Sequence, residues 1–273
     1  MEIGFVFTNF NNSIYTKRAV ESIQQCGSVG APIIVVDNGS SEQDVNDLKD
    51  IELAFPDVTV IYNKENVGYF RGLNIGIEYA RNTHKNMELL IVGNNDLIFS
   101  TDFYSSIMSN KDKFDKYPVV SPNIKTVDGI YQNPHVISGI SKFREIIYDL
   151  YHLSYFLARS IKLISNITHK FTDRKDETQH EVAQEIHQGY GACYILGPVF
   201  FKHFELLWAP TFLMYEEYFL SKQLEEKGFK FYYEPSIKIQ HYCHATTSNL
   251  PGRKKWEFSR DAHREYRKHL KIW

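Results

Sequence analysis

Short apolar runs alternate with amphipathic stretches along the first part of the chain. The apolar runs lie at residues 3–8, 33–36, 58–62, 89–92 and 119–122. Runs of this length bounded by polar residues are typical of strands that are buried on both faces. The stretches between them carry apolar residues at helical spacing and lie at 13–25, 43–54, 70–83 and 101–113. This alternation predicts parallel βαβ units with right-handed crossovers.

The remainder of the chain has a less regular pattern. Residues 125–140 have the composition of a loop, and residues 188–201 begin with small side chains and continue as a buried strand. A helix is predicted over 212–227, with a glycine as its stop. Two other segments, 141–172 and 253–273, interleave Lys and Arg with aromatic and aliphatic residues, which predicts basic amphipathic helices.

Composition narrows the class of protein. The chain has 273 residues, 43% of them hydrophobic, and a formal net charge of −2, so its overall charge does not indicate nucleic acid as a partner. Its three cysteines are too few and too scattered for a disulfide framework or a zinc site, which favours a reducing compartment. The amino terminus has no signal-peptide pattern, and the longest uncharged stretch is too short to span a bilayer. We therefore expect a soluble, cytoplasmic α/β protein.

Polar side chains follow the last apolar residue of four predicted strands. They are Thr8 with Asn9, Asp37, Asn63, and Asn94 with Asp96. Parallel strands end along one edge of a sheet, and ligands bind outside that edge, so these residues predict a nucleotide site there. The alternative is that they are ordinary polar loop residues. A dinucleotide or P-loop site is disfavoured, because neither glycine-rich motif occurs in the chain.

A pair of glutamates begins the predicted helix at 212–227. Counted from Leu213, Glu217 falls on the same apolar stripe as Leu220 and Leu224, whereas Glu216 is rotated away from it. A carboxylate on an apolar stripe must be paired, or it must serve chemistry with a raised pKa. Glu217 is therefore the candidate for a chemical role.

Seven short motifs occur in order along the chain. They are VVDNGS at 35–40, ENVG at 65–68, GLNIG at 72–76, NND at 94–96, GAC at 191–193, YEE at 215–217 and His241. In this combination the chain resembles the inverting family 2 glycosyltransferases of the GT-A fold, especially the branch of bacterial rhamnosyltransferases that build O-antigen and capsule. The resemblance covers most of residues 3–247. It implies an α/β fold with a central, mostly parallel sheet flanked by helices, to which the basic amphipathic helices are additions.

The resemblance also implies a division of the chain. Residues 1–247 would form the GT-A catalytic domain, and 248–273 a C-terminal basic aromatic helix. Within the domain, 1–122 would bind the nucleotide sugar, 123–187 would form a loop and a basic helical insertion, and 188–247 would form the acceptor and catalytic half.

Roles for individual residues follow from the same resemblance. Glu217 would be the catalytic base, and Asp96 and His241 would lie at a Mn²⁺ or Mg²⁺ ion on the donor diphosphate. The nucleotide-binding residues would be Thr8, Asn9, Asp37, Asn66, Gly68, Arg71, Asn74 and Asn94. Gly191, Tyr215 and Glu216 would face the acceptor. Asn94 stands where many members of the family carry Asp, which predicts weaker metal binding.

The expected activity is metal-assisted transfer of a sugar, with inversion, from a UDP- or dTDP-linked donor to a hydroxyl of a growing, lipid-linked surface glycan. A sugar nucleotidyltransferase is a second class, but the glycine-rich basic loop that it needs after the first strand is missing. A catalytically silent glycan-binding domain is a third, and the joint presence of Asp96, Glu217 and His241 argues against it. The two basic segments predict peripheral contact with the anionic inner face of the plasma membrane, or packing on the domain or a second subunit.

Overall fold

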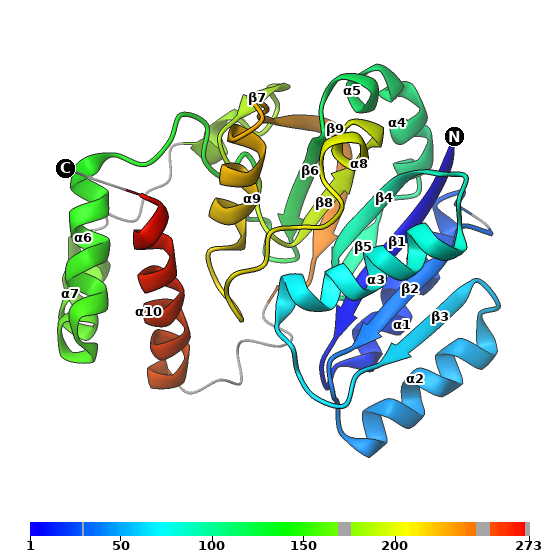
Figure 1. Ribbon diagram of the computed structural model, residues 1–273, viewed down its shortest axis with the longest axis horizontal. Helices are drawn as coiled ribbons and strands as arrows, with labels where there is room; N and C mark the ends of the chain where they lie inside the picture. Colours follow the sequence, from blue (N-terminus) through cyan, green and yellow to red (C-terminus); the bar gives the residue numbers. More distant parts are fainter. Residues whose placement is uncertain (29, 169–175, 244–251, 271–273) are drawn as a thin grey trace.

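The computed structural model describes residues 1–28, 30–168, 176–243 and 252–270 (Figure 1). The first half follows the predicted alternation, with β1 (Glu2–Asn9), α1 (Ser13–Gln25), β2 (Ile33–Asp37), α2 (Glu42–Ala54), β3 (Val58–Tyr62), α3 (Tyr69–Thr83) and β4 (Met87–Asn94). The central part has β5 (Leu97–Phe99), α4 (Phe103–Ser109), α5 (Lys111–Lys116), β6 (Val119–Thr126), α6 (Lys142–Leu153), α7 (Tyr155–Thr168) and a 3₁₀ turn (Asp176–Gln179). The last part has β7 (Gln184–Ile186), β8 (Cys193–Leu196), α8 (Pro198–His203), α9 (Glu216–Glu225), β9 (Phe231–His241) and α10 (Gly252–His269).

All nine strands of the described residues belong to one sheet, in the order β3-β2-β1-β4-β8-β6-β9-β5, with β7 paired to β9. The predicted parallel pairing holds for the first four of these strands, β3, β2, β1 and β4. Beyond β4 the sheet is mixed, because β8 runs antiparallel to both β4 and β6, whereas β6 and β9 are parallel. The predicted α/β fold class is therefore confirmed, with a second half that is less parallel than the first.

The inner strands are buried on both faces, as their continuous apolar runs require. In β1, Phe5 and Phe7 pack on the side of the sheet covered by α1 and α2, and Val6 packs on the opposite side against α3. The same alternation of faces occurs in β2 and β4. Helices α8 and α9 extend the second layer over the antiparallel half of the sheet (Figure 1).

Three element boundaries differ from the predicted ones for local reasons. The strand at 119–122 does not stop at Pro122, because the register between β6 and β9 shifts there, and an irregular position tolerates a residue without an N–H. The strand within 188–201 is short, since Pro198 occupies the first turn of α8. Helix α9 begins at Glu216 rather than at 212, because Met214 and Tyr215 have positive φ angles of 78° and 67°.

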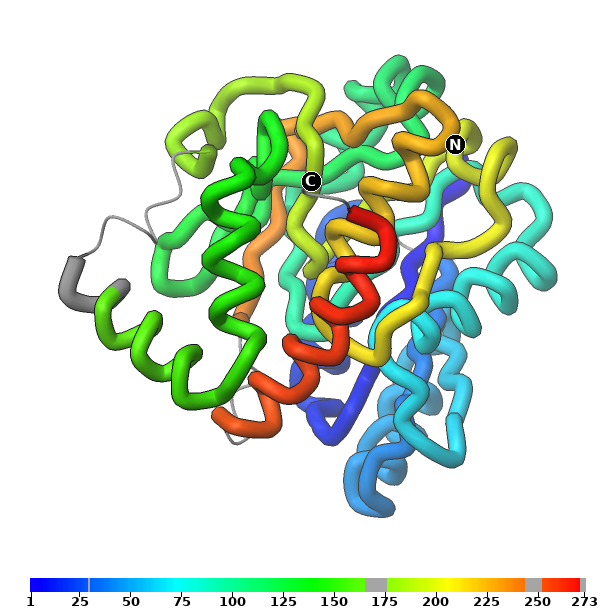
Figure 2. Tube along the Cα trace, turned by 60° about the vertical axis from the view of Figure 1, so that its left-hand side comes forward, coloured from blue at the N-terminus to red at the C-terminus, as the bar shows by residue number. Residues whose placement is uncertain are grey.

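The basic amphipathic segments form three helices at one end of the molecule. Helices α6 and α7 lie side by side as a hairpin, and α10 lies between this hairpin and the rest of the protein in both views (Figures 1 and 2). Trp256 and Tyr266 of α10 are buried, so this helix packs on the protein, one of the alternatives left open by the sequence. Residues 248–251 and 271–273 of the predicted C-terminal segment lie outside the described residues. Among the described helices, none combines the length and apolar character needed to cross a bilayer.

Helix α3 approaches the sheet closely at Gly76, and Gly76→Ala should lower stability. A Cβ atom there would lie 2.4 Å from Cγ1 of Val6 and 3.0 Å from Cγ2 of Val36, both on stiff β-branched side chains. Overpacking of this kind costs about 1–3 kcal/mol, against a gain of about 1 kcal/mol from better helix propensity. We expect a net loss of about 1 kcal/mol in the free energy of unfolding, measured in urea.

The exposed Glu78 of the same helix provides the control for this prediction. Glu78→Ala should stay within about 0.5 kcal/mol of the wild type. A Gly76→Ala protein that equals or exceeds the wild type in stability would show that α3 can move away from the sheet.

Candidate active site

A cavity of about 540 Å³ opens at the carboxyl ends of β1 and β4, the edge where the sequence places its polar residues. Ten of the fourteen predicted site residues line it: Thr8, Asn9, Asn66, Gly68, Asn94, Asp96, Gly191, Glu216, Glu217 and His241. The other four lie behind it or beside it: Asp37, Arg71, Asn74 and Tyr215. The strand ends converge here because β1 and β4 are parallel neighbours, and the antiparallel β8 begins beside the end of β4.

Asp96 and His241 form a buried pair in the wall of the cavity. Oδ1 of Asp96 lies 3.1 Å from Nε2 of His241, and both side chains are almost fully buried. The other ring nitrogen, Nδ1, lies 2.7 Å from Oε1 of Gln132, which can only accept a hydrogen bond, so Nδ1 carries the proton. In the neutral ring Nε2 is then an acceptor. Two acceptor atoms, Nε2 of His241 and Oδ1 of Asp96, therefore face each other. A proton or a cation between them would make this contact favourable.

This donor set suits a divalent cation that is shared with a substrate. Carboxylate oxygen and imidazole nitrogen are both ligands for Mn²⁺, and such ions often take only one or two protein ligands together with phosphate oxygens. In the part of the chain that the structure describes, no cluster of three or more His, Cys, Asp or Glu side chains has the arrangement of a metal site. Asp96 and His241 alone would thus leave most coordination positions to diphosphate and water.

Asp37, predicted to bind the nucleotide, lies in the layer that supports the cavity wall and is not among the lining residues. Its carboxylate accepts hydrogen bonds from Nδ2 of Asn9, at 3.1 Å, and from the backbone N–H of Ser40, also at 3.1 Å. Asn9 lies on β1, the strand next to Asp37, and its Oδ1 accepts a hydrogen bond from Nδ2 of Asn95 at 2.9 Å. A chain of hydrogen bonds therefore ties the ends of β2, β1 and β4 together. Asn95, the middle residue of the NND motif, has this structural role.

Arg71 and Asn74 also lie outside the cavity, although both were predicted to bind nucleotide. Arg71 donates to the carbonyl oxygens of Ala209 and Pro210, at 3.2 and 3.3 Å. Asn74 pairs with the backbone of Leu207 in both directions, at 2.8 and 2.9 Å. Both side chains point from α3 toward the segment before α9. They hold that segment, which leads into the cavity wall at 212–217.

Glu216 and Glu217 both line the cavity. Glu216 is buried on α9 together with Leu220 and Leu224, so the prediction that it is rotated away from the apolar stripe is wrong. Glu216 is the more buried of the two, and its Oε1 accepts a hydrogen bond from the backbone N–H of Met214 at 2.9 Å. Leu213 is not part of the helix, so the phase of α9 cannot be counted from it. The apolar stripe starts one turn later, and the first turn of α9 faces the cavity.

The two carboxylates differ in their surroundings. Burial, assisted by the negative charge of Glu217, raises the pKa of Glu216 to about 8. Glu217 is only partly buried, and its Oε1 accepts a hydrogen bond from the backbone N–H of Gly191 at 3.1 Å. The carbonyl of Gly191 in turn accepts from the hydroxyl of Tyr69 at 2.7 Å. Burial raises the pKa of Tyr69, so this hydroxyl stays protonated and the Gly191 peptide is held from both sides.

Helix α10 closes one side of the cavity, a contribution that the sequence did not predict. Lys254 and Phe258 line the cavity, and the ring of Phe258 stacks on that of Phe212 with centroids 5.3 Å apart. Tyr215, predicted to face the acceptor, instead points at α10, where its hydroxyl lies 2.9 Å from Nδ1 of His263. The basic aromatic pattern identified the helix, but no local signal shows which of its residues meet the cavity.

This arrangement of sheet and cavity is the GT-A glycosyltransferase fold, and solved structures of that fold are similar to it. The structure of GalNAc-T7 with UDP, GalNAc and Mn²⁺ has a TM-score of 0.57 and 16% sequence identity, covering 92% of this chain and 45% of that one. The mannosyltransferase PcManGT from Pyrobaculum calidifontis, in complex with GDP-Man and Mn²⁺, has a TM-score of 0.56 and 11% identity, covering 96% of this chain and 61% of that one. The structure of residues 1–349 of S. aureus TarS has a TM-score of 0.51 and 11% sequence identity, covering 88% of this chain and 60% of that one.

The family model for glycosyl transferase family 2 matches residues 5–170, which is more than half of the chain. The chain therefore belongs to this family. It spans 45% to 61% of the length of the three similar structures. No curated protein matches its sequence.

Glu216→Gln should remove part of the pH dependence of stability. The pKa of Glu216 is raised on folding, so the folded state binds more protons than the unfolded state from about pH 5 to about pH 8. The free energy of unfolding therefore falls as the pH rises through this window. Gln cannot ionise, so the stability of the variant relative to the wild type should increase with pH. Urea unfolding across the window measures both slopes.

Glu226→Gln, at the exposed end of the same helix, is the matched control and should keep the wild-type slope. Equal slopes for the wild type and Glu216→Gln would contradict the assignment of the raised pKa.

Proposed function

We propose that the protein is an inverting glycosyltransferase that moves a sugar from a nucleotide-diphosphate donor to a hydroxyl of an acceptor glycan. The observation that carries this proposal is that one cavity holds both a buried carboxylate–imidazole pair, Asp96 with His241, and a pair of carboxylates, Glu216 with Glu217. The first suits a metal diphosphate, and the second can take a proton from a nucleophile. Membership of glycosyl transferase family 2 supports the same reaction class and disfavours a nucleotidyltransferase.

Asp96 and His241 would hold a Mn²⁺ or Mg²⁺ ion. When bound, such an ion stabilises the negative charge that develops on the leaving nucleoside diphosphate. Two of the similar structures, GalNAc-T7 and PcManGT, were determined with UDP or GDP-Man together with Mn²⁺, which supports a cation at this edge of the sheet. Gln132 positions His241 by accepting its Nδ1 proton, so the lone pair of Nε2 is left beside Oδ1 of Asp96 and Nδ2 of Asn94.

Glu217 is proposed as the general base. Its carboxylate is oriented by the Gly191 N–H, and a Cβ atom on residue 191 would lie only 2.7 Å from its Oε1, so glycine allows this approach. Two neighbouring carboxylates resist being ionised together, and burial places the proton on Glu216. Glu217 is then the carboxylate that can accept the proton of an acceptor hydroxyl as the new bond forms on the opposite face of the sugar.

The donor would lie along the strand ends. Thr8, Asn9, Asn66, Gly68 and Asn94 would contact the nucleotide, a uridine or thymidine diphosphate, and Asp37 would act through Asn9. Gly68 has a φ of 95°, and a Cβ there would lie 2.3 Å from the carbonyl oxygen of Phe212, so only glycine lets the 212–217 segment cross at this point.

The acceptor would enter beside Gly191 and Glu216, opposite the wall formed by α10. We propose a growing, lipid-linked oligosaccharide of O-antigen or capsule type as this acceptor, built by an enzyme of the rhamnosyltransferase-like branch. Its place would be the cytoplasm, at the inner face of the plasma membrane. The motif order in residues 35–241 supports this branch.

Asp96→Ala should abolish metal-dependent nucleotide binding. The side chain lies at the edge of the cavity and its removal takes away the only carboxylate of the Asp96–His241 pair, so the cation loses its strongest protein ligand. Calorimetric titration with UDP and dTDP, with and without Mn²⁺, measures the effect. Asp102→Ala, an exposed carboxylate outside the cavity, is the control and should bind as the wild type does. Unchanged nucleotide affinity of Asp96→Ala in Mn²⁺ would refute the metal assignment.

Glu217→Gln should lower kcat by about 10²–10⁴-fold with donor binding nearly unchanged, because Gln keeps the shape of the side chain but cannot accept the proton. A panel of nucleotide sugars with Mn²⁺, screened for donor hydrolysis, first supplies the substrate for this measurement. Glu216→Gln should lower kcat much less at neutral pH, since Gln resembles the protonated form of Glu216. If Glu217→Gln lowers the melting temperature and leaves kcat intact, Glu217 has a structural role and is not the base.

A further inference from the structure

The α6–α7 hairpin carries a dense group of exposed apolar side chains. Within the described residues, fifteen large hydrophobic side chains are exposed, and seven of them lie on these two helices. They are Phe143, Leu150, Leu153, Phe156, Leu157, Leu163 and Ile164. Phe156 is 80% exposed and Leu153 69% exposed, at the corner between the two helices. Exposed apolar side chains that gather on one pair of helices are typical of a site of interaction with a protein or a membrane.

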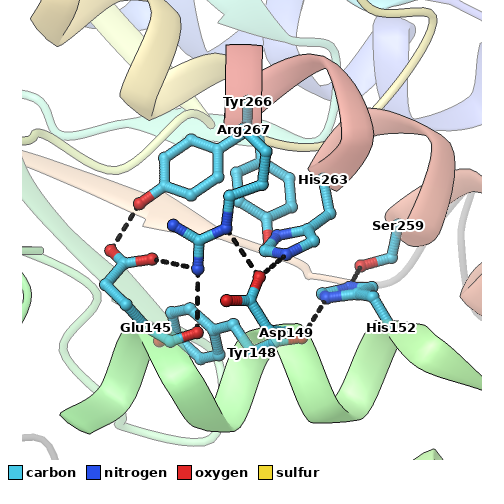
Figure 3. Close-up of polar contacts among 9 residues, drawn as sticks. Glu145, Tyr148, Asp149, His152, Ser259, His263, Tyr266 and Arg267 are labelled. Carbon is cyan, nitrogen blue, oxygen red and sulfur yellow. Dashed lines mark hydrogen bonds and ion pairs between the residues drawn. The ribbon is translucent and has the colours of Figure 1, made fainter. Parts of the chain in front are cut away.

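The inward face of the hairpin is already occupied by α10. Figure 3 shows Glu145, Asp149 and His152 of α6 directed at Ser259, His263, Tyr266 and Arg267 of α10. Arg267 bridges Glu145 and Asp149, at 3.0 and 2.6 Å. His152 bonds to Ser259 at 2.9 Å, and burial and the neighbouring His263 lower its pKa to about 4, so the ring is neutral. This face of α6 is thus packed on α10.

This packing against α10 also separates the acidic residues of the hairpin from its exposed basic residues. Glu145 and Asp149 are the only acidic residues of α6 and α7, and both are paired with α10. Three cations are exposed on the described part of the hairpin, Lys142, Arg159 and Lys162. None of the exposed residues between 142 and 164 is acidic. The outward face therefore combines apolar side chains with positive charge alone.

We propose that this outward face, residues 142–164, docks on an anionic membrane surface. Apolar side chains at the headgroup boundary and Lys and Arg against lipid phosphates are the two contributions that hold amphipathic helices at such a surface. A second copy of the chain fits less well, because a symmetric interface would bring the same cations of both copies together with no carboxylate to neutralise them.

The role of this membrane contact in catalysis rests on the proposed function, whereas the membrane contact itself is inferred independently of it. Helix α10 packs on α6 and also supplies Lys254 and Phe258 to the wall of the cavity. A hairpin bound to a bilayer would thus keep the cavity beside the membrane, where a lipid-linked acceptor is found. The second basic segment, α10, would act as the support and not as the membrane contact.

Sedimentation of the full chain with vesicles tests the proposal. We expect binding to vesicles of phosphatidylcholine with phosphatidylglycerol, weaker binding at high salt, and little binding to phosphatidylcholine alone. Lys142→Gln/Arg159→Gln/Lys162→Gln should weaken binding about 100-fold, from about fivefold for each cation near the surface. The matched control, Lys17→Gln/Lys49→Gln/Lys64→Gln, removes three exposed cations elsewhere and should bind as the wild type does.

A second pair of variants tests the apolar contribution. Leu153→Ser/Phe156→Ser should reduce vesicle binding, whereas Ile14→Ser/Leu53→Ser, which changes exposed apolar residues outside the hairpin, should not. All four side chains are exposed, so melting temperatures should stay near that of the wild type. Absence of salt-sensitive binding, or equal binding by hairpin and control variants, would overturn the proposal. So would a dimer in sedimentation equilibrium that Leu153→Ser/Phe156→Ser dissociates without changing vesicle binding.

Donor hydrolysis, measured on the same preparations without vesicles, separates the two proposals. Vesicle binding without hydrolysis of any nucleotide sugar would reject the proposed function and leave the membrane contact standing. Hydrolysis of a nucleotide sugar without vesicle binding would reject the membrane contact and leave the proposed function standing.

Discussion

The close approach of β4 and β8 is the constraint on which the site depends. At Gly93 a Cβ atom would lie 2.2 Å from the carbonyl oxygen of Ala192, so only glycine lets the two strands meet at this point. The backbone N–H of Asn94 then donates to that same carbonyl at 2.9 Å. This contact sets Gly191, which orients Glu217, beside the NND motif that contains Asp96. The two chemical halves of the cavity are thus joined through the pairing of β4 with β8.

The positions of the first seven elements could be read from the sequence because their signals are local. Strands buried on both faces need continuous apolar runs, and the helices between them keep a helical period, so elements from β1 to β4 were predicted nearly in full. The convergence of Thr8, Asn9, Asn94 and Asp96 follows from the same pattern, since parallel neighbours end together. Short strands such as β5 and β7 were not predicted, because three residues carry too little periodicity.

The direction of individual side chains could not be predicted in the same way. Asn74 lies in the GLNIG motif and Arg71 directly precedes it, yet both side chains bind the backbone of 207–210, a segment more than 130 residues away. Glu216 was misplaced because the phase of α9 depends on the left-handed conformations of Met214 and Tyr215, which the sequence does not signal. The contribution of α10 to the cavity depends on long-range packing alone. Motif and period locate a site, whereas tertiary contacts decide which atoms face it.

The insertion of β8 between β4 and β6 also has a consequence for how the chain folds during synthesis. β4 gains its partner on one side, β1, as soon as residue 94 has emerged, but its partner on the other side lies about a hundred residues later. Until Leu196 is available, the first half of the sheet has an apolar strand with an unpaired edge, the kind of edge at which chains associate wrongly. Closing the long loop between the two strands costs entropy before their contacts form, so we expect this pairing to form late in assembly. The same contact that completes the cavity is thus the one that makes the nascent chain vulnerable until most of it has been made.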